Sequence, residues 1–402
     1  MPLPRASLRS FLSSAKSALN NAAQQSSPVT FVIGNESADL DSLCSAVVLA
    51  YIRTYSLKSK TFYIPLSNIP RADLNLRPEL LSVLSHANLR PSDLITLSDL
   101  PSITSNSSRL SPEKTKWVLV DHNVMVGELG KIYGDQLVAC IDHHDEENKV
   151  PKDTAEEPRI VQKCGSCSSL VVQYGREAWD SLASKTSQDH QAKWNAELAR
   201  LALAPILIDT SNLKDESKTT PVDVEVVKYL QHWITSEEEG PFDAEDYFKE
   251  IADAEKDVDS MSLVDLLRKD YKEWNDGGVP LGICSVVKDM PFLVKKAGGT
   301  EQFLSAVKDF AKERKLSVCS VMTRTLNNGV FSRELLVWGF GQKGIESAKS
   351  FEQDAKPKLD LQTWKDGSLD LDNNQWCRCW SQGKAQDSRK QVAPLLRTAI
   401  SG

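Results

Sequence analysis

The chain has 402 residues, of which 41% are hydrophobic, and a formal net charge of −7. Its length predicts two or three domains, and no apolar run reaches the roughly 18 residues of a membrane-spanning helix. The negative charge excludes broad coating of nucleic acid, so a polyanion site would have to be a local basic patch. The eight cysteines show no disulfide-like framework and predict reduced thiols in an intracellular protein.

The first 34 residues contain basic residues, many serines and no acidic residue. That composition resembles a mitochondrial transit peptide. The same segment carries an apolar stripe at helical spacing, formed by Leu8, Phe11, Leu12, Ala15 and Leu19. We expect a first helix that packs on the domain of a cytoplasmic protein, with the mitochondrial matrix as the alternative location.

Apolar runs of the N-terminal half end in polar side chains. Unbroken hydrophobic runs are typical of parallel strands that are buried on both faces. In chain order, the runs and the side chains that follow them are Thr30–Ile33 with Asn35, Asp39 and Asp41; Trp117–Val120 with Asp121; Leu137–Ile141 with Asp142, His143 and His144; and Ile206–Ile208 with Asp209. Because sites in open α/β sheets lie outside the carboxyl ends of the strands, we expect these side chains to converge at one edge.

Such a cluster of anions would repel itself, and divalent cations are the simplest remedy. Carboxylate oxygens with imidazole suit Mn²⁺ or Mg²⁺ better than a thiolate-seeking ion. Two ions bridged by shared aspartates would activate a water and hold a phosphoryl oxygen. Each aspartate alone could instead cap a helix or a turn, as Asp39 or Asp41 could for a helix starting near Ser42. We favour the metal site because four caps of one chemical type after strands would be a coincidence.

The N-terminal half alternates strands with helical patterns, which predicts a largely parallel sheet. Expected elements there are helices at 42–55, 166–182, 192–204 and 222–234, the last opened by Pro221, and a strand at 60–65. The polar segment 236–240 is the expected linker between domains 1–235 and 241–402. For the second domain we expect an α+β fold, with an acidic helical stretch to about Trp274, strands near 281–287, 317–323 and 334–339, and a helix at 302–313.

The polar motifs resemble a known family. Asn35-x-x-x-Asp39-x-Asp41, Asp121-His122-Asn123, Asp142-His143-His144 and Asp209 are similar, in order, to the four motifs of the DHH phosphoesterase superfamily. The resemblance is closest to the branch with a DHHA2 domain, which holds family II inorganic pyrophosphatases, fungal cytosolic exopolyphosphatases and prune proteins. It implies an α/β fold, in which an N-terminal parallel-sheet DHH domain and a smaller α+β DHHA2 domain enclose the active site in a cleft.

One departure favours the fungal exopolyphosphatases within that branch. Family II pyrophosphatases carry His where this chain has Asn35. An amide oxygen is a weaker ligand than imidazole for transition metals, so the change favours Mg²⁺. Prune proteins depart at the histidine pair, which this chain keeps as His143 and His144.

The resemblance also implies roles for single residues. His143 would bind metal, and His144, which points to the other side of the strand end, would donate to a phosphate oxygen. Independently of the resemblance, the backbone N–H groups at Gly165–Cys167 could face phosphate too, or the segment could be a plain helix start. The implied metal ligands are Asn35, Asp39, Asp41, Asp121, His143 and Asp209. The implied catalytic residues are Asp121, His144, Arg389 and Lys390.

Cations of the second domain would bind the substrate phosphates. Ser388-Arg389-Lys390 is similar to the Ser-Arg-Lys signature of DHHA2 domains. Lys272, with Lys269 as the alternative, lies where pyrophosphatase relatives place a further lysine. Arg378 is a weaker candidate, because its flanks could equally mark a strand with the arginine facing solvent.

The predicted function is therefore that of a metal-dependent exopolyphosphatase, which releases terminal orthophosphate from linear inorganic polyphosphate by two-metal water attack. Its cofactors would be two divalent cations, Mg²⁺ or Mn²⁺, with Co²⁺ as a further candidate. The alternatives are a family II-type inorganic pyrophosphatase, a DHH phosphodiesterase and a prune-like interaction protein. We expect a monomer that binds neither membrane nor nucleic acid.

Overall fold

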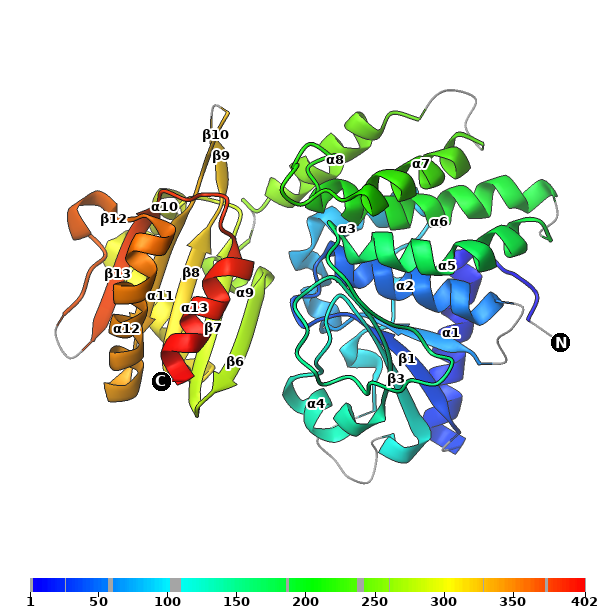
Figure 1. Ribbon diagram of the computed structural model, residues 1–402, viewed down its shortest axis with the longest axis horizontal. Coiled ribbons are helices and arrows are strands. Elements are labelled where there is room, and N and C mark those ends of the chain that lie inside the picture. Colours follow the sequence, from blue (N-terminus) through cyan, green and yellow to red (C-terminus); the bar gives the residue numbers. More distant parts are fainter. Residues whose placement is uncertain are drawn as a thin grey trace. The chain divides into compact units, whose positions relative to one another are not determined.

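The structure, a computed structural model, describes residues 3–25, 27–56, 61–101, 110–185, 188–236, 242–259, 261–327, 329–372 and 375–401. The chain divides into two compact units, Met1–Glu255 and Lys256–Gly402 (Figure 1). This division falls beyond the predicted linker 236–240, of which residues 237–240 lie outside the described residues. Helix α8 (Ala244–Lys256) buries Tyr247 and Ile251 in the core of the first unit, and therefore belongs largely to that unit.

The first unit contains a five-stranded sheet in the order β2-β1-β3-β4-β5, and every neighbouring pair of strands is parallel. Its strands are β1 (Val29–Ile33), β2 (Tyr63–Leu66), β3 (Thr115–Val120), β4 (Leu137–Asp142) and β5 (Arg159–Val161). The runs are apolar throughout because both faces of the sheet are covered. Val32 and Val118 face the larger core, while Phe31 and Trp117 stack in the other, with ring centroids 4.6 Å apart.

Helices cover the sheet of the first unit (Figure 1). Besides α8 they are α1 (Leu8–Gln25), α2 (Leu40–Tyr55), α3 (Pro78–His86), α4 (Gly127–Tyr133), α5 (Cys167–Ala183), α6 (Gln188–Asp209) and α7 (Pro221–Thr235). Short 3₁₀ turns lie at Arg71–Leu76, Pro91–Asp93, Leu97–Asp99, Pro112–Lys114 and Gly134–Gln136. The predicted stripe of α1 is buried, and Phe11 packs edge-on against Tyr51. Among the described helices, none is both long and apolar enough to span a membrane.

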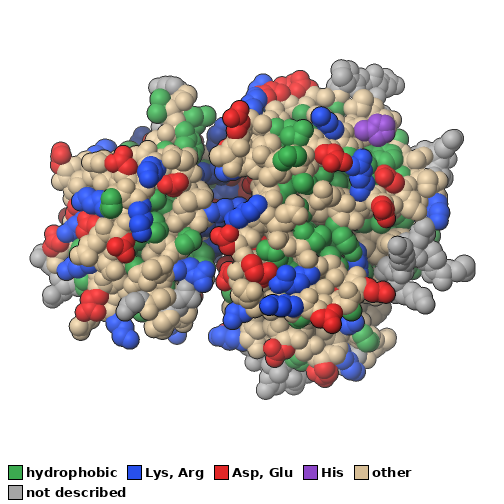
Figure 2. All heavy atoms as spheres, viewed as in Figure 1, with side chains coloured by type: hydrophobic (Ala, Val, Ile, Leu, Met, Phe, Trp, Pro, Cys, Tyr) green, Lys and Arg blue, Asp and Glu red, His purple; other side chains and the backbone are tan. Residues whose placement is uncertain are grey.

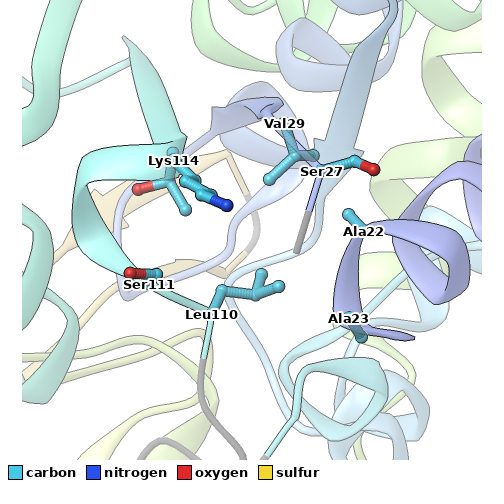
Figure 3. A pocket seen from close by; sticks show the side chains of 8 residues that line it. Ala22, Ala23, Ser27, Val29, Leu110, Ser111 and Lys114 are labelled. Atoms are coloured by element: carbon cyan, nitrogen blue, oxygen red, sulfur yellow. The ribbon is translucent and has the colours of Figure 1, made fainter. Parts of the chain in front are cut away.

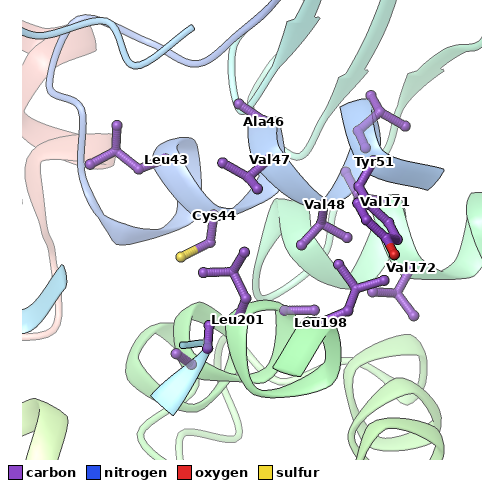
Figure 4. Packing of buried hydrophobic residues seen from close by; sticks show 14 of the residues in the cluster. Leu43, Cys44, Ala46, Val47, Val48, Tyr51, Val171, Val172, Leu198 and Leu201 are labelled. Carbon is purple, nitrogen blue, oxygen red and sulfur yellow. The ribbon is translucent and has the colours of Figure 1, made fainter. Parts of the chain in front are cut away.

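The core between α2, α5 and α6 holds the start of α2 in place. Figure 4 shows Cys44, Val47 and Val48 of α2 packed toward Leu198 and Leu201 of α6, with Val171 of α5 beside them. α2 is buried on nearly all sides, which is why its sequence reads as apolar around the whole helix. The first turn of α2, with Asp41, and its N-cap Asp39 are thereby fixed at the carboxyl end of β1.

The second unit contains a six-stranded mixed sheet in the order β12-β13-β11-β8-β7-β6, in which only β7 and β8 pair in parallel. The strands are β6 (Tyr271–Asp276), β7 (Val279–Val286), β8 (Val318–Thr323), β11 (Glu334–Gly339), β12 (Leu361–Thr363) and β13 (Trp376–Gln382), with a separate hairpin of β9 (Thr325–Asn327) and β10 (Val330–Ser332). The helical segments are α9 (Leu263–Lys269), α10 (Met290–Ala297), α11 (Thr300–Glu313), α12 (Gly341–Leu359) and α13 (Arg389–Ser401), with a 3₁₀ turn at Trp364–Gly367. α12 and α13 bury one face of the sheet. The predicted α/β fold class, with a parallel first sheet and an α+β second part, is confirmed.

Two element predictions are wrong. The run Ile206–Ile208 is the last turn of α6 and not a strand, so Asp209 ends a helix. A short apolar run cannot distinguish a buried strand from a buried helix by periodicity. The acidic helix expected to reach Trp274 ends at Lys269, and Lys272 lies on β6.

Acidic and basic side chains are intermixed over the visible face of each unit (Figure 2). A small hollow of about 50 Å³ lies at the opposite, amino-terminal ends of β1 and β3, where Val29 and Thr115 begin these strands. Its lining, which includes Ala22, Leu110 and Lys114, comes from α1 and from the approach to β3 (Figure 3). The hollow is therefore separate from the predicted site.

Candidate metal centre

The predicted convergence of polar side chains occurs at the ends of β1, β3 and β4. Asp121 leaves β3 with a φ of 62°, a left-handed conformation that a residue other than glycine adopts at some cost. This turn keeps the Asp121 carboxylate at the sheet edge, where it is 2% exposed. Its Oδ2 accepts hydrogen bonds from Asn35 Nδ2 at 2.8 Å and from Ser42 Oγ at 2.7 Å. Asn35 lies in the segment that connects β1 to α2, and Ser42 lies in the first turn of α2.

His143 presents one nitrogen to this carboxylate. Its Nδ1 lies 3.0 Å from the carbonyl oxygen of Cys164 and therefore carries the proton that it donates there. The lone pair is then on Nε2, which lies 3.2 Å from Asp121 Oδ1 and 4.0 Å from Asp41 Oδ2. A backbone carbonyl that fixes the tautomer in this way is the usual support of a metal-binding histidine.

Asp142 orients the other histidine. Its Oδ1 accepts from His144 Nδ1 at 2.8 Å, and its Oδ2 accepts from Asn123 Nδ2 at 2.6 Å. Burial alone would raise the pKa of Asp142, but the hydrogen bond and the charge of His144 hold it well below its usual range. Asp142 is thus an anion that directs the remaining nitrogen of His144, and His144 Nδ1 lies 3.7 Å from Asp121 Oδ1.

Asp41 is held by the start of helix α5. Its Oδ2 accepts from the backbone N–H of Cys167 at 2.6 Å and its Oδ1 from that of Ser168 at 2.9 Å. The N–H groups of Gly165, Ser166 and Cys167 were predicted to face phosphate or to form a plain helix start. They donate to carboxylates, those of Gly165 and Ser166 to Asp223 and that of Cys167 to Asp41. Burial and the nearby charge of Asp121 raise the pKa of Asp41 to about 6, although the helix end and His143 favour its anion.

The donor set fits a divalent cation. Asp121, His143 and His144 each offer one ligand atom, and these atoms lie within 4.8 Å of one another. Buried carboxylates whose mutual repulsion raises a pKa gain most from a cation. Oxygen ligands with imidazole nitrogen suit Mn²⁺, Mg²⁺ or a similar ion.

The three other predicted ligands, Asn35, Asp39 and Asp209, lie in different local surroundings. Asn35 Oδ1 accepts from the N–H of Ser37 at 2.9 Å, so its amide nitrogen, and not its oxygen, faces Asp121. Asp39 caps α2 through Oδ1, as the alternative interpretation of this residue predicted, and its second oxygen is left for another role. Asp209 ends α6 next to Thr210, whose Cγ2 would lie 2.6 Å from a Cβ at Gly165. The end of α6 therefore lies beside the loop that begins α5.

The predicted phosphate-binding tripeptide of the second unit starts helix α13. Ser388 precedes it, and its N–H and Oγ both bond to Gln391 Oε1, at 2.9 and 3.1 Å. Arg389 pairs with Asp270 Oδ1 at 2.8 Å, immediately before β6, on which Lys272 lies. The tripeptide is thus in the first turn of a helix and not in an open loop, and Arg389 is tied to the strand that carries Lys272.

Arg378 contacts residues that lie close to it in the sequence. It lies on β13, next to the edge strand β12, whereas β6 forms the opposite edge of the sheet. Its guanidinium pairs with Asp372 at 2.6 Å and donates to the Leu371 carbonyl at 3.1 Å. These contacts hold residues just before β13. The strand of the alternative interpretation is present, but its arginine pairs with Asp372 and does not simply face solvent.

Sequence reasoning missed the residues that orient the ligands. Ser42 and Cys164 contact Asp121 and His143, and Asn123 contacts Asp142, which orients His144. Ser42 and Asn123 lie within or next to the motifs. Cys164 acts through its backbone carbonyl, for which no side-chain pattern exists.

Comparison with known proteins agrees with the fold and the motifs. The model described as "DHH family, N-terminal domain" matches residues 29–206, and the model described as "DHHA2 domain" matches residues 249–399. A candidate family II inorganic pyrophosphatase from Methanococcus jannaschii, known by its crystal structure, has the same fold, with a TM-score of 0.60 and 22% identity over 93% of this chain and 100% of that one. The class defined by fold and site is that of α/β proteins with an acidic, histidine-containing centre at the sheet edge.

Two relatives of similar sequence indicate the family within this class. A candidate exopolyphosphatase of Schizosaccharomyces pombe is 33% identical over 384 residues, which cover 95% of this chain and 94% of that protein. A manganese-dependent inorganic pyrophosphatase of Methanocaldococcus jannaschii is 26% identical over 258 residues, which cover 64% of this chain and 70% of that protein. The chain belongs to the DHH family, in the branch with a C-terminal DHHA2 domain, as its motifs predicted.

Proposed function

We propose that the protein is a metal-dependent exopolyphosphatase that releases terminal orthophosphate from linear inorganic polyphosphate. The observation that carries this proposal is the Nε2 lone pair of His143, fixed by Cys164 and directed at the carboxylates of Asp121 and Asp41. Buried carboxylates that converge with an imidazole lone pair are best explained as ligands of a cation. A centre of this kind in a DHH–DHHA2 chain supports phosphoanhydride hydrolysis.

Asp39, Asp41, Asp121, His143 and Asp209 would hold two divalent cations, Mg²⁺ or Mn²⁺. When bound, the cations neutralise phosphoryl charge and lower the pKa of water. The contacts of Asn35 support a positioning role beside this centre, because its amide nitrogen holds Asp121 Oδ2. The manganese-dependent relative supports Mn²⁺ as one of the ions.

The chain's own residues would bind the substrate and stabilise the charge that develops on it. His144, oriented by Asp142, would donate a hydrogen bond from its second nitrogen to a phosphoryl oxygen. Arg389 and Lys390, at the start of α13, would supply a planar fork and a compact charge for further phosphates, with Lys272 and Ser388 beside them. In-line attack of water at the terminal phosphorus would then release orthophosphate.

Two observations favour polyphosphate over pyrophosphate as the proposed substrate. Asn35 stands where the pyrophosphatase motif has histidine, and a relative that matches 95% of the chain is named as a candidate exopolyphosphatase.

Phosphate release from tripolyphosphate and from pyrophosphate, with Mg²⁺ or Mn²⁺, tests the proposal. We expect faster turnover of tripolyphosphate, near-complete loss in Asp121→Asn, and a loss of about 2–4 kcal/mol of transition-state stabilisation in Lys390→Ala. Matched controls are the exposed Asp135→Asn and Lys343→Ala, the latter also in the first turn of a helix. Faster turnover of pyrophosphate would make the protein a pyrophosphatase, and full activity in both site variants would refute the site.

A further inference from the structure

A short loop before helix α5 supports two of the metal-ligand candidates at once. The carbonyl oxygen of Cys164 accepts from His143 Nδ1, and so decides which nitrogen of His143 bears the lone pair. Three and four residues later, the N–H groups of Cys167 and Ser168 hold both oxygens of Asp41. A shift of this loop would therefore move Asp41 and His143 together.

The other side of the loop is held by one carboxylate, that of Asp223 in the first turn of α7. Asp223 is fully buried, at 0% exposure, and among the described residues it contacts hydrogen-bond donors and no charged side chain. It accepts from the N–H groups of Gly165 at 2.9 Å and Ser166 at 3.3 Å, and from Ser169 Oγ at 2.6 Å. The Sγ of Cys164 also donates to it, at 3.2 Å.

The loop is tightly packed against Asp223 and Thr210 at Gly165. A Cβ at that position would lie 2.6 Å from Thr210 Cγ2 and 2.7 Å from Asp223 Oδ2, so only glycine fits. The loop is thus pressed between α7 and the end of α6, which carries the third ligand candidate, Asp209. Asp41 and His143 thus depend on the position of this loop, and the end of α6 packs against it through Thr210.

We propose that Asp223 is a positioning residue of the metal centre, which sets the geometry of Asp41 and His143 through the loop 164–168 without touching the cation. This inference rests on the metal centre of the proposed function. It assigns Asp223 a role in cation affinity that its position at a helix start does not require.

A purely structural role must be separated from this one, because Asp223 also belongs to the capping box of α7. Thr220 Oγ1 accepts from the N–H of Asp223, and the Asp223 side chain accepts from the N–H of Thr220 at 2.8 Å. Thr220→Ala removes the cap of α7 and the 2.7 Å hydrogen bond from Thr220 Oγ1 to Asp223 Oδ2. It keeps the Asp223 carboxylate and its donors in the loop, Gly165, Ser166 and Ser169, and is therefore the control for a change that destabilises α7 while the carboxylate still faces the loop.

The test is calorimetric titration of the metal-free protein with Mn²⁺ alone, without substrate. In Asp223→Asn an amide N–H group faces the N–H donors of the loop, so we expect Mn²⁺ to bind about ten-fold or more weakly, as for other outer residues of metal sites. Thr220→Ala should lower the melting temperature but keep the parent's dissociation constant within about two-fold. In phosphate-release assays, Asp223→Asn should need more Mn²⁺ for half-maximal activity and recover most of kcat at saturating metal.

Ser169→Ala keeps the test decisive if Asp223→Asn does not fold. It removes only the 2.6 Å bond to Asp223, and we expect a smaller weakening of Mn²⁺ binding in the same direction. Parent-like Mn²⁺ affinity in the folded Asp223→Asn protein, or in Ser169→Ala where the former does not fold, would overturn the inference. Equal weakening in Thr220→Ala would also overturn it, in favour of a helix-capping role. A parent protein that binds no Mn²⁺ would refute the proposed metal centre itself.

Discussion

Asn35 illustrates how a single residue can be predicted in place and still differ in role. Its amide donates to Asp121 through Nδ2, to Oδ2 at 2.8 Å and to the backbone oxygen at 3.0 Å. The side chain is 1% exposed, so neither partner can be replaced by water. We infer that Asn35 keeps the Asp121 carboxylate in place when no cation is bound.

Asn35→Asp should therefore destabilise the metal-free protein. The change removes two donors and sets a second buried carboxylate against Asp121, at a cost of about 2 kcal/mol or more in the free energy of unfolding. Mn²⁺ should offset this cost, so the rise in melting temperature on adding Mn²⁺ should be larger for Asn35→Asp than for the parent. Thermal unfolding with and without Mn²⁺ measures both effects.

The exposed Asn148→Asp is the control, and it should melt like the parent in both conditions. If metal-free Asn35→Asp melts at the parent's temperature, the amide does not hold Asp121 and the assigned role is wrong.

The sequence predicted the side chains of the candidate centre better than their supports. Asp121 and His143 were found because they directly follow apolar strands whose ends must share an edge. The direction of the Asn35 amide depends on the N–H of Ser37, and the tautomer of His143 depends on the carbonyl of Cys164. Backbone donors and acceptors are the same in every residue, so no sequence pattern can mark them.

At the scale of elements, unbroken strands and capped helices were predictable and short apolar runs were not. Pro221 at the start of α7 and the Gln302–Glu313 pattern of α11 gave nearly correct bounds. Ile206–Ile208 was read as a strand because three apolar residues fit either period, and the helix continues through Pro205. Asp209 therefore lies at the end of a helix, and not of a strand, beside the loop that begins α5.

The start of α13 gives a prediction at this scale. Ser388 and Gln391 fix the first helical turn, which carries Arg389 and Lys390. Ser388→Ala should cost about 1 kcal/mol of stability and let this turn fray. Because the turn would bind phosphate, KM for tripolyphosphate should rise several-fold while kcat changes little. Steady-state phosphate release gives both constants.

Ser262→Ala is the matched comparison, since Ser262 caps α9 by accepting from the N–H of Asp265. It should lower the melting temperature to a similar extent and leave KM unchanged. A rise of KM in both variants would mean that general loss of stability, and not the α13 turn, controls substrate binding.

At the scale of the whole molecule, the two kinds of candidate residue are divided between the two units. Every candidate metal ligand lies in Met1–Glu255, and the candidate phosphate-binding cations other than His144 lie in Lys256–Gly402. The order of motifs in the sequence predicted this division, because each motif belongs to a segment with its own core. The sequence could not predict that α8 packs on the first unit, since its amphipathic pattern does not say which core it covers.

This division predicts where a cation acts. A ligand that binds only the folded state stabilises it by about 2.7 kcal/mol at a hundred-fold excess over Kd, and the gain applies to the unit that holds the site. Mn²⁺ alone should therefore slow hydrogen exchange in β1, β3, β4 and the start of α5, and leave β11 and β13 of the second unit unchanged. Exchange measured by mass spectrometry on the full chain resolves these segments. Asp121→Asn should abolish the protection, whereas the exposed Asp135→Asn should retain it. Protection that instead centres on the second unit would place the cation on residues other than Asp41, Asp121 and His143.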